Sequence, residues 1–429
     1  MIQILFFAFI WPPIKVDKFV LDNGLTVLVY EDHFAPVVSA QIHYRVGAYN
    51  EPKGLTGISH LLEHMAFKGT KKHGPKVYDR VIHEAGGEEN GFTSTHVTAY
   101  FANLNRDRYP LELEFEADRM VNLLLDPKEF EPEKHVVMEE RRLNDNDPYG
   151  AFGEEFDLLT YLYHPYRNPV VGFMSDLERI TLADVAAWYK KHYNPANAIV
   201  VIAGDVKAEA ARNLVNKLFG KLKGVPVGDD IFAEPPQSGE RRFEFRKDVR
   251  MPAVGIQYHT VPVLAPDAYA LNLIGMILSQ GRSSRFQREV VRGKNLAINI
   301  YAYSSTAKYG GTFYIFGMPQ AGVDVKTLEA EIERQLELLK TEKVGAEELD
   351  KAKCLVLAQT VYRQDSPTGI GFTVANWEIS TGDWQNINRF PEEIQKVTAD
   401  DIVRVAQKYF IRDNRTVGFL LPSEKSEEK

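Results

Sequence analysis

The feature that most constrains the fold of this chain is an internal repeat. Residues 180–197 read ITLADVAAWYKKHYNPAN, and residues 397–414 read VTADDIVRVAQKYFIRDN. A weaker echo relates residues 36–42 to residues 252–258 at nearly the same spacing along the chain. Two matches at one spacing indicate that a single module occurs twice. The two halves are therefore expected to share one fold.

Each half combines strand patterns with helix patterns. In the first half, alternating apolar residues at 25–30 and 37–46 predict strands of a sheet with one covered face. Helical segments follow, and a helix that starts with Thr and Asp leads into a last apolar strand at 198–203. We predict an α+β fold with two homologous domains, each a mostly antiparallel sheet packed by helices.

The predicted boundary between the halves lies in residues 224–240. This stretch, GVPVGDDIFAEPPQSGE, is rich in Gly, Pro and acidic residues and shows no apolar periodicity, so we expect a linker. We predict an N-terminal domain at 15–223 and a C-terminal domain at 241–422. A chain of 429 residues is long enough for two or three domains.

Charge and cysteine content exclude several classes of protein. The net charge of −8 and the pI of about 5.8 argue against a nucleic-acid partner, which requires a basic surface. The single cysteine, Cys354, excludes an internal disulfide and a cysteine-based zinc site. We expect Cys354 to be a small residue of the core.

The N-terminus is apolar over residues 2–11 (IQILFFAFIW), and two prolines follow. This stretch is too short to span a bilayer as a helix. No Lys or Arg precedes it and no small-residue cleavage site follows, so an export signal, a weak membrane anchor and a packed strand all stay open. No other segment is predicted to be a transmembrane helix. The apolar start favours a bacterial cell envelope or periplasm, with the cytoplasm as the alternative.

The main candidate for chemistry is the sequence HLLEH, which contains His60, Glu63 and His64. A helix is predicted over residues 56–69, and on it the two histidines share one face, one turn apart. Both imidazoles can then reach one zinc ion. Zinc brings the pKa of a bound water towards neutrality, and a carboxylate can take its proton as the water attacks a carbonyl. Glu63 is better placed for that step than for binding the metal.

A zinc site of this kind needs a third protein ligand. Residues 132–144 (PEKHVVMEERRLN) predict a second helix, on which Glu133 and Glu140 lie two turns apart on one face. Glu139 points about 100° away from that face. Glu140 is therefore the candidate ligand, and Glu133 could orient a histidine or the water. The alternative is a core histidine at position 60 and a solvated acidic face on the second helix.

The motif and the sequences around it resemble those of a known protein family. The HxxEH pattern with a glutamate at position 140 is the inverted zinc motif, and the flanking blocks FVLDNGLTVLVYED, GAYNEPKGLTGISHLLEHMAFKGT and GGEENGFTSTHVTAYF carry the same likeness. Over about residues 15–422, the chain resembles the pitrilysin/insulinase zinc metallopeptidases. It is most similar to the processing-peptidase branch, which includes the mitochondrial processing peptidase β subunit and bacterial relatives.

The resemblance implies a zinc-dependent endopeptidase with one Zn²⁺ per chain. It implies that the ion is held by three side chains, with Glu63 as the general base and Glu133 as a further functional glutamate on the second helix, the one that carries Glu140. The implied ligands are His60, His64 and Glu140.

The resemblance also implies how substrate binds. Extended peptides or presequence-like segments would add as a strand to a sheet edge near Asn90, Gly91, Phe92 and Thr93. Gly91 stands where the family usually has Ala, which leaves the detailed contact open.

The second half lacks the motif. At the spacing of the repeat, three residues without metal-binding chemistry fall opposite the motif: Met276 opposite His60, Ser279 opposite Glu63 and Gln280 opposite His64. We therefore expect no zinc site in the second half, which would close the other side of a cleft.

The family's second domain carries an Arg and, seven residues later, a Tyr that hold the substrate, and here these positions are Val291 and Ile298. Arg292 and Tyr301 lie nearby but out of phase, and on a regular strand Tyr301 would face opposite to Ile298. The resemblance thus implies a heterodimer with a homologous subunit that lacks zinc and supplies the Arg/Tyr pair. A homodimer in which Arg292 or Arg282 substitutes is the alternative.

A function from another class is a non-catalytic scaffold or assembly subunit, because core subunits of the respiratory bc1 complex resemble this family. A scaffold has no chemical reason to keep a complete ligand set together with a base. The sequence therefore favours the peptidase.

Overall fold

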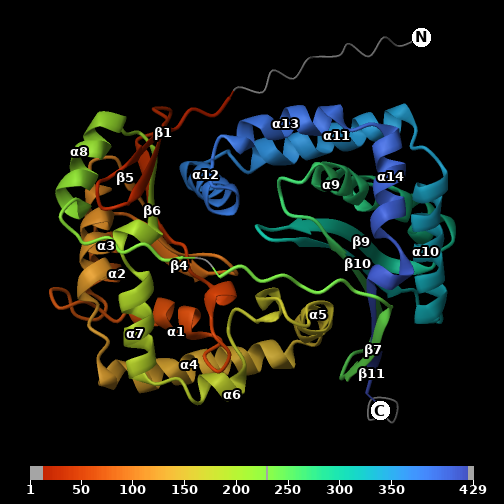
Figure 1. Ribbon diagram of the computed structural model, residues 1–429, viewed down its shortest axis with the longest axis horizontal. Coiled ribbons are helices and arrows are strands. Elements are labelled where there is room, and N and C mark those ends of the chain that lie inside the picture. Colours follow the sequence, from red (N-terminus) through yellow and green to blue (C-terminus); the bar gives the residue numbers. More distant parts are fainter. Residues whose placement is uncertain (1–12, 229, 424–429) are drawn as a thin grey trace.

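The computed structural model describes residues 13–228 and 230–423, and the predicted N-terminal apolar segment lies outside these residues. Two halves stand side by side, each made of one sheet and its helices, and an extended segment crosses from one to the other (Figure 1). The predicted α+β class with a duplicated module is confirmed. The boundaries at 15–223, 224–240 and 241–422 stay a prediction.

The first sheet has six strands in the order β1-β2-β6-β3-β5-β4. The β2–β6 pair is parallel and the other pairs are antiparallel. The strands are β1 Asp17–Val20, β2 Thr26–Glu31, β3 Val37–Tyr44, β4 Glu88–Thr93, β5 Thr98–Asn105 and β6 Ala198–Gly204.

The second sheet has five strands in the order β7-β11-β8-β10-β9. Its β7–β11 pair is parallel and the rest are antiparallel, so it repeats the arrangement of the first sheet without β1. The strands are β7 Arg241–Lys247, β8 Ala253–Thr260, β9 Ala297–Thr306, β10 Gly311–Pro319 and β11 Arg415–Pro422.

The helices of the two halves also correspond. The clearest pair is the one before the last strand: Thr181 and Thr398 each accept a hydrogen bond from the backbone N–H of an aspartate three residues on, and that aspartate accepts one in return. The first-half helices are α1 Ile58–Ala66, α2 Val77–Glu84, α3 Pro110–Asn122, α4 Pro127–Asn146, α5 Pro148–Thr160, α6 Met174–Leu177, α7 Leu182–His192 and α8 Ala208–Phe219. The second-half helices are α9 Pro266–Ser279, a π-helix Phe286–Gly293, α10 Val325–Thr341, α11 Ala346–Tyr362, α12 Pro367–Thr381, α13 Asn386–Lys396 and α14 Ala399–Tyr409.

In each half, one helix packs against the sheet of the other half. Helix α5 contacts β7, β8 and β11 of the second sheet, and α12 contacts β2, β3 and β6 of the first. Phe152 and Phe156 of α5 are buried against the second sheet, where a Cβ on Gly255 would lie 2.5 Å from the Phe156 ring. In the reverse direction, Ile370 and Val374 of α12 are buried in a cluster with strands of the first sheet. The apolar surface of each half is thus completed by the other.

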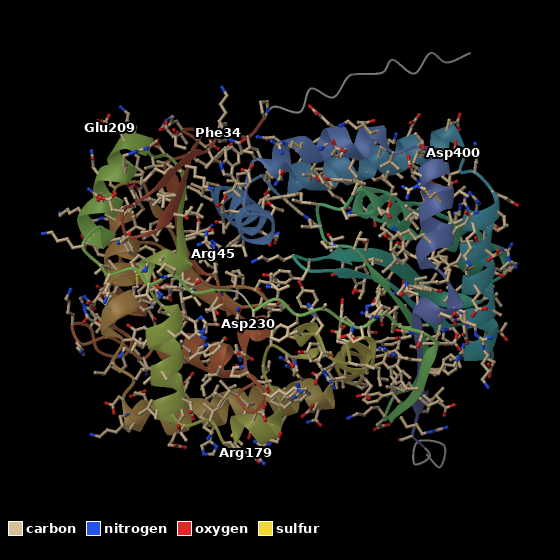
Figure 2. All side chains as sticks on the ribbon, in the orientation of Figure 1. Phe34, Arg45, Arg179, Glu209, Asp230 and Asp400 are labelled. Carbon is tan, nitrogen blue, oxygen red and sulfur yellow. The ribbon has the colours of Figure 1, made fainter. Side chains whose placement is uncertain are left out.

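The extended segment between the halves is anchored to the first half. Its Asp230 backbone carbonyl accepts a 2.6 Å hydrogen bond from the hydroxyl of Tyr49, which is buried (Figure 2). Glu234, further along, accepts backbone N–H groups from residues 162–164. The predicted linker carries no helix or strand in its described residues.

The prediction that Cys354 is a core residue is wrong: the side chain is exposed on α11, because the buried face of that helix is formed by Leu349, Ala352 and Val356. Among the described residues, no helix has both the length and the apolar character needed to cross a membrane.

Candidate metal centre

Helix α1 is held at its start by a buried carboxylate. Glu51 accepts hydrogen bonds from the backbone N–H of Gly57 at 2.7 Å and of Ser59 at 2.8 Å. Gly57 has φ of 87°, and a Cβ there would come within 2.3 Å of the Val171 carbonyl oxygen, so glycine is required. Burial raises the pKa of Glu51 to about 7, against its backbone hydrogen bonds. The start of α1 is therefore fixed in place just before His60.

Three side chains from α1 and α4 converge on one point. His60 Nε2 lies 3.6 Å from Glu140 Oε2, and His64 Nε2 lies 3.5 Å from the same oxygen. In a tetrahedral site with bonds of about 2.0–2.1 Å, neighbouring ligand atoms are about 3.4 Å apart. Among the described residues, these three form the one group of His, Cys, Asp or Glu that could hold a metal ion. Both distances are close to that spacing, and all three ligand atoms lie within 4.8 Å of one another, so the donor set suits zinc.

The second glutamate of α4 orients one of the histidines. Glu133 Oε1 lies 2.9 Å from His64 Nδ1, and its other oxygen lies 2.6 Å from Lys68 Nζ. Burial alone would raise the pKa of Glu133, but its hydrogen bonds with His64 and Lys68 outweigh burial and lower it. Because Nδ1 of His64 is hydrogen-bonded to a carboxylate, its Nε2 atom, which faces Glu140, remains available to bind a metal ion. Glu139, as predicted from helix geometry, points elsewhere and pairs with Arg142.

The two histidines differ in their surroundings. Burial and the neighbouring His64 lower the pKa of His60 to about 4, which keeps its imidazole neutral and able to bind a metal. Burial also opposes protonation of His64, but Glu133, Glu140 and Glu63 outweigh it and raise its pKa. The His60 Nδ1 atom is buried without a hydrogen-bond partner among the described residues.

Glu63 lies beside the three convergent side chains but outside their group. Its carboxylate is buried and accepts a 2.7 Å hydrogen bond from the Thr93 hydroxyl at the end of β4. Burial raises the pKa of Glu63, while Thr93 and the charge of His64 oppose that rise. A carboxylate held this way can exchange a proton with a group bound next to it.

Strand β4, which contains Asn90, Gly91, Phe92 and Thr93, is the terminal strand of the first sheet. It pairs with β5 on one side, so the other side offers backbone groups to an incoming strand. A Cβ on Gly91 would lie 3.0 Å from Tyr100 and 3.1 Å from Phe67, so the glycine makes room for these rings.

The second-half counterparts of the motif carry no metal-binding chemistry. Ser279 of α9 donates to the carbonyls of Gly275 and Ala302 at 2.9 and 2.8 Å. Met276 packs against the second core, and Gln280 caps the end of the helix.

The region of the predicted Arg/Tyr pair differs from expectation in one respect. Strand β9 shifts register against β10 between Met318 and Pro319, which leaves Ile298 as an extra residue. As a result, Ile298 is 50% exposed and Tyr301 is 38% exposed, on the same face of the sheet. The expectation of opposite faces, which assumed a regular strand, is wrong. Arg292 of the π-helix turns back to donate to the carbonyls of Gln287 and Arg282.

Comparison with known proteins defines the class to which this fold and site belong. The family model described as insulinase (peptidase family M16) matches residues 26–164, and the model described as the M16 inactive domain matches residues 179–355. The chain therefore belongs to the insulinase, or M16, peptidase family.

Relatives of this chain carry protease names. The zinc protease PqqE of Helicobacter pylori is 32% identical over 414 residues, which cover 95% of this chain and 93% of the relative. A crystal structure of a protease from Helicobacter pylori has a TM-score of 0.91 at 31% identity and covers 96% of this chain and 100% of that one. The periplasmic protease PqqL of Escherichia coli shares the fold, with a TM-score of 0.82 at 17% identity over 97% of this chain and 49% of that one.

Proposed function

We propose that this chain is a zinc-dependent endopeptidase that hydrolyses extended peptides or presequence-like segments. The observation that carries the proposal is the convergence of His60 Nε2, His64 Nε2 and Glu140 Oε2 at ligand spacing. One Zn²⁺ per chain would be held by these three atoms. The names of the relatives support zinc as the metal.

Zinc, when bound, supplies a positive charge that polarises a peptide carbonyl and lowers the pKa of water. The remaining work falls to the side chains around it. Glu63 acts as the general base: its carboxylate, held by the Thr93 hydroxyl, takes a proton from the attacking water and can return it to the leaving amine. Glu133 holds His64 in the orientation that the ligand role needs.

Substrate binding is proposed at the free edge of β4. An extended peptide that pairs with residues 90–93 would lie next to Thr93, whose hydroxyl contacts the base. Backbone hydrogen bonds supply affinity and read little sequence. This mode suits a peptidase that accepts extended segments of varied composition.

The partner is proposed to be a homologous subunit that lacks zinc and supplies an Arg/Tyr pair. The support is that Val291 and Ile298 stand at the corresponding positions here, and that Arg292 is occupied with backbone carbonyls. A homodimer in which Arg292 or Arg282 substitutes for the pair is the alternative. Peptidase assays of the purified chain alone and with its homologue distinguish them, since full activity alone contradicts the heterodimer.

A non-catalytic scaffold role is the second candidate function. It is favoured only by the kinship with assembly subunits of the same family, and it gives the converging ligands no role.

For location, we propose the periplasm or cell envelope, supported by the periplasmic neighbour PqqL. Cell fractionation tests this, and recovery in the cytoplasm contradicts it.

The experiment that tests the function compares two adjacent glutamates of α4. Glu140→Gln is expected to weaken zinc binding at least 100-fold and to abolish peptide cleavage, because it removes a ligand. Glu139→Gln, which changes an exposed residue of the same helix, is the matched control and is expected to keep both. Zinc content and cleavage of a fluorogenic peptide are measured. Equal zinc and activity in the two variants would refute the assignment.

A further inference from the structure

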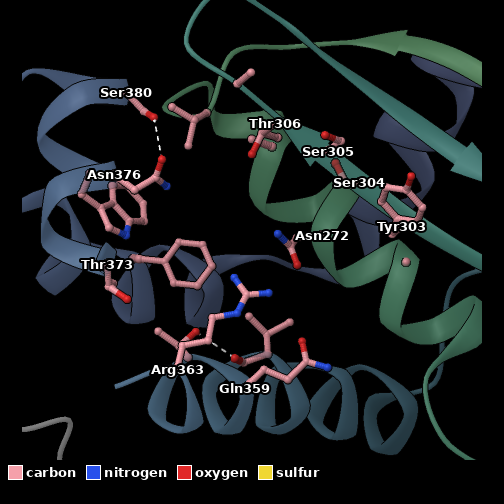
Figure 3. Close-up of a pocket in the computed structure, with 18 of the residues that line it drawn as sticks. Asn272, Tyr303, Ser304, Ser305, Thr306, Gln359, Arg363, Thr373, Asn376 and Ser380 are labelled. Carbon is pink, nitrogen blue, oxygen red and sulfur yellow. Dashed lines mark hydrogen bonds between the residues drawn. The ribbon is translucent and has the colours of Figure 1, made fainter. Parts of the chain in front are cut away.

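A cavity of about 920 Å³ lies against α9 and β9 of the second half, the counterparts of α1 and β4 at the metal centre of the first half (Figure 3). In the first half, α1 contacts α4 and β4; in the second half, α9 contacts α11 and β9 in the same way. Met276, Ser279 and Gln280, the counterparts of the metal motif, line this cavity. The cavity of the second half thus corresponds in position to the metal centre of the first half, but its side chains differ in chemistry.

The charge of the cavity wall is one-sided. None of its described lining residues is Asp or Glu, although the whole chain has a net charge of −8. Arg363, at the end of α11, is the one Lys or Arg among them and reaches into the cavity towards Asn272 of α9 (Figure 3). No hydrogen bond or ion pair joins its guanidinium to another described residue. A cation in this setting favours an anion.

The rest of the wall suits a peptide. Amides of Asn272, Gln359 and Asn376 face the space, together with hydroxyls of β9 and α12 (Figure 3). Such groups can satisfy the N–H and C=O groups of a bound backbone. The apolar part of the wall includes Phe372 and Trp377 of α12. A single guanidinium matches a monovalent carboxylate through its two-pronged geometry, and it lacks the several cations that a polyphosphate would require.

The cavity lies next to the proposed active site along the chain. Thr93 donates to the carboxylate of Glu63, and the next residues along the chain, 94–97, line the cavity. Phe92 of β4 also packs edge-on against Phe372 of the cavity wall, with ring centres 5.5 Å apart. A peptide that follows β4 past the metal centre is therefore led to this wall.

We propose that this cavity binds a carboxylate of the peptide substrate through Arg363. The carboxylate is either the C-terminus of the peptide or an acidic side chain. The proposal rests on the proposed peptidase function and adds a subsite to it in the half without metal. Arg363 here is a substrate-positioning residue, remote from the bond that is cleaved.

The experiment uses the zinc-loaded, full-length chain, with its partner if one is required, and three peptides of one sequence without internal acids. The first has a free C-terminus, the second a C-terminal amide, and the third an amide and one Glu. In the wild type, we expect KM to be about 5- to 10-fold lower for the first or the third than for the second, with similar kcat. A preference for the first assigns the C-terminus, and a preference for the third assigns the side chain.

Three variants test the residue. Arg363→Gln is expected to lose the preference and to keep cleavage of the amidated peptide, whereas Arg363→Lys is expected to keep part of it. Arg389→Gln, an exposed arginine of α13, is the matched control and is expected to behave as wild type. A preference that survives in Arg363→Gln, or a wild type without any preference, would overturn the proposal.

Failure of the peptidase function itself gives a different result, namely no cleavage of any of the three peptides by the wild type. Calorimetric binding of the same peptides then still tests the cavity. Tighter binding of a carboxylate peptide to the wild type than to Arg363→Gln supports the subsite, and equal binding refutes it.

Discussion

The helix pair α1–α4 and the helix pair α9–α11 occupy corresponding places in two halves of one duplicated fold, but they carry opposite chemistry. The first pair brings the Nε2 atoms of two imidazoles within 3.6 Å of one carboxylate oxygen across its interface. The second pair lines a cavity with Met276, Ser279 and one unpaired guanidinium, that of Arg363 among the described residues. The shared module therefore determines where a site can form, and a few side chains determine the chemistry of that site.

The largest expected effect comes from the base and its counterpart. Glu63→Gln should lower kcat by about 10²- to 10⁴-fold and retain stoichiometric zinc, because the amide cannot accept the proton. Ser279→Ala, the matching change in the second half, should leave kcat within twofold. Steady-state kinetics and metal analysis of both variants check the contrast. Near wild-type cleavage by Glu63→Gln would mean that another group is the base.

The exchanged helices α5 and α12 test whether the two halves depend on each other for stability. Phe156→Ala in α5 should lower the free energy of unfolding by about 3–5 kcal/mol, because a buried ring of the first half is removed from the core of the second. Since the halves complete each other, we expect one shifted denaturation transition for the whole chain. Two separate transitions, with that of the first half unchanged, would show that the halves fold independently.

A substitution of Glu133 tests how much zinc binding depends on the hydrogen bond that orients His64. Glu133→Gln should weaken zinc binding about 10- to 100-fold and keep the three ligands in place, because it loosens the orientation of His64. Competition with a chelator measures the affinity. An unchanged zinc affinity would assign Glu133 to a purely structural ion pair with Lys68.

The smallest expected effect concerns the start of the counterpart helix α9. Burial of Asp267 acts to raise its pKa, but hydrogen bonds from Lys408, Arg404 and Tyr409 outweigh it and lower the pKa to about 2. Because the folded pKa lies below the ordinary value, this stabilisation is full above about pH 4 and is lost as the pH falls towards 2.

Asp267→Asn should therefore cost about 1–2 kcal/mol at pH 7 and roughly half of that at pH 3. Urea denaturation of both proteins across this pH range provides the measurement. A difference between wild type and variant that does not change with pH would contradict the charge-based account.

The parts of the fold that depend on local patterns could be predicted from the sequence. The motif helix and the second glutamate helix follow from apolar periodicity and 3.6-residue geometry, and these place His60, His64 and Glu140 on facing surfaces. The repeat predicted two similar halves. The assigned roles of these residues remain predictions.

What could not be predicted depends on contacts between distant segments. The capping of α1 by Glu51, the support of Glu133 by Lys68 and the exchange of α5 with α12 each require the folded chain to bring remote residues together. The extra residue at Ile298 has no local signal, since an irregular register appears only when β9 is paired with β10. The cavity around Arg363 likewise arises from segments of both halves that no sequence window contains.

The most direct test of the central claim is anomalous X-ray scattering at the zinc absorption edge from crystals of the zinc-loaded protein. The account predicts one anomalous peak per chain, within about 2.2 Å of His60 Nε2, His64 Nε2 and a carboxylate oxygen of Glu140, and no peak in the cavity beside α9. A zinc peak bound by other residues, or none at the three ligands despite stoichiometric zinc, would contradict it.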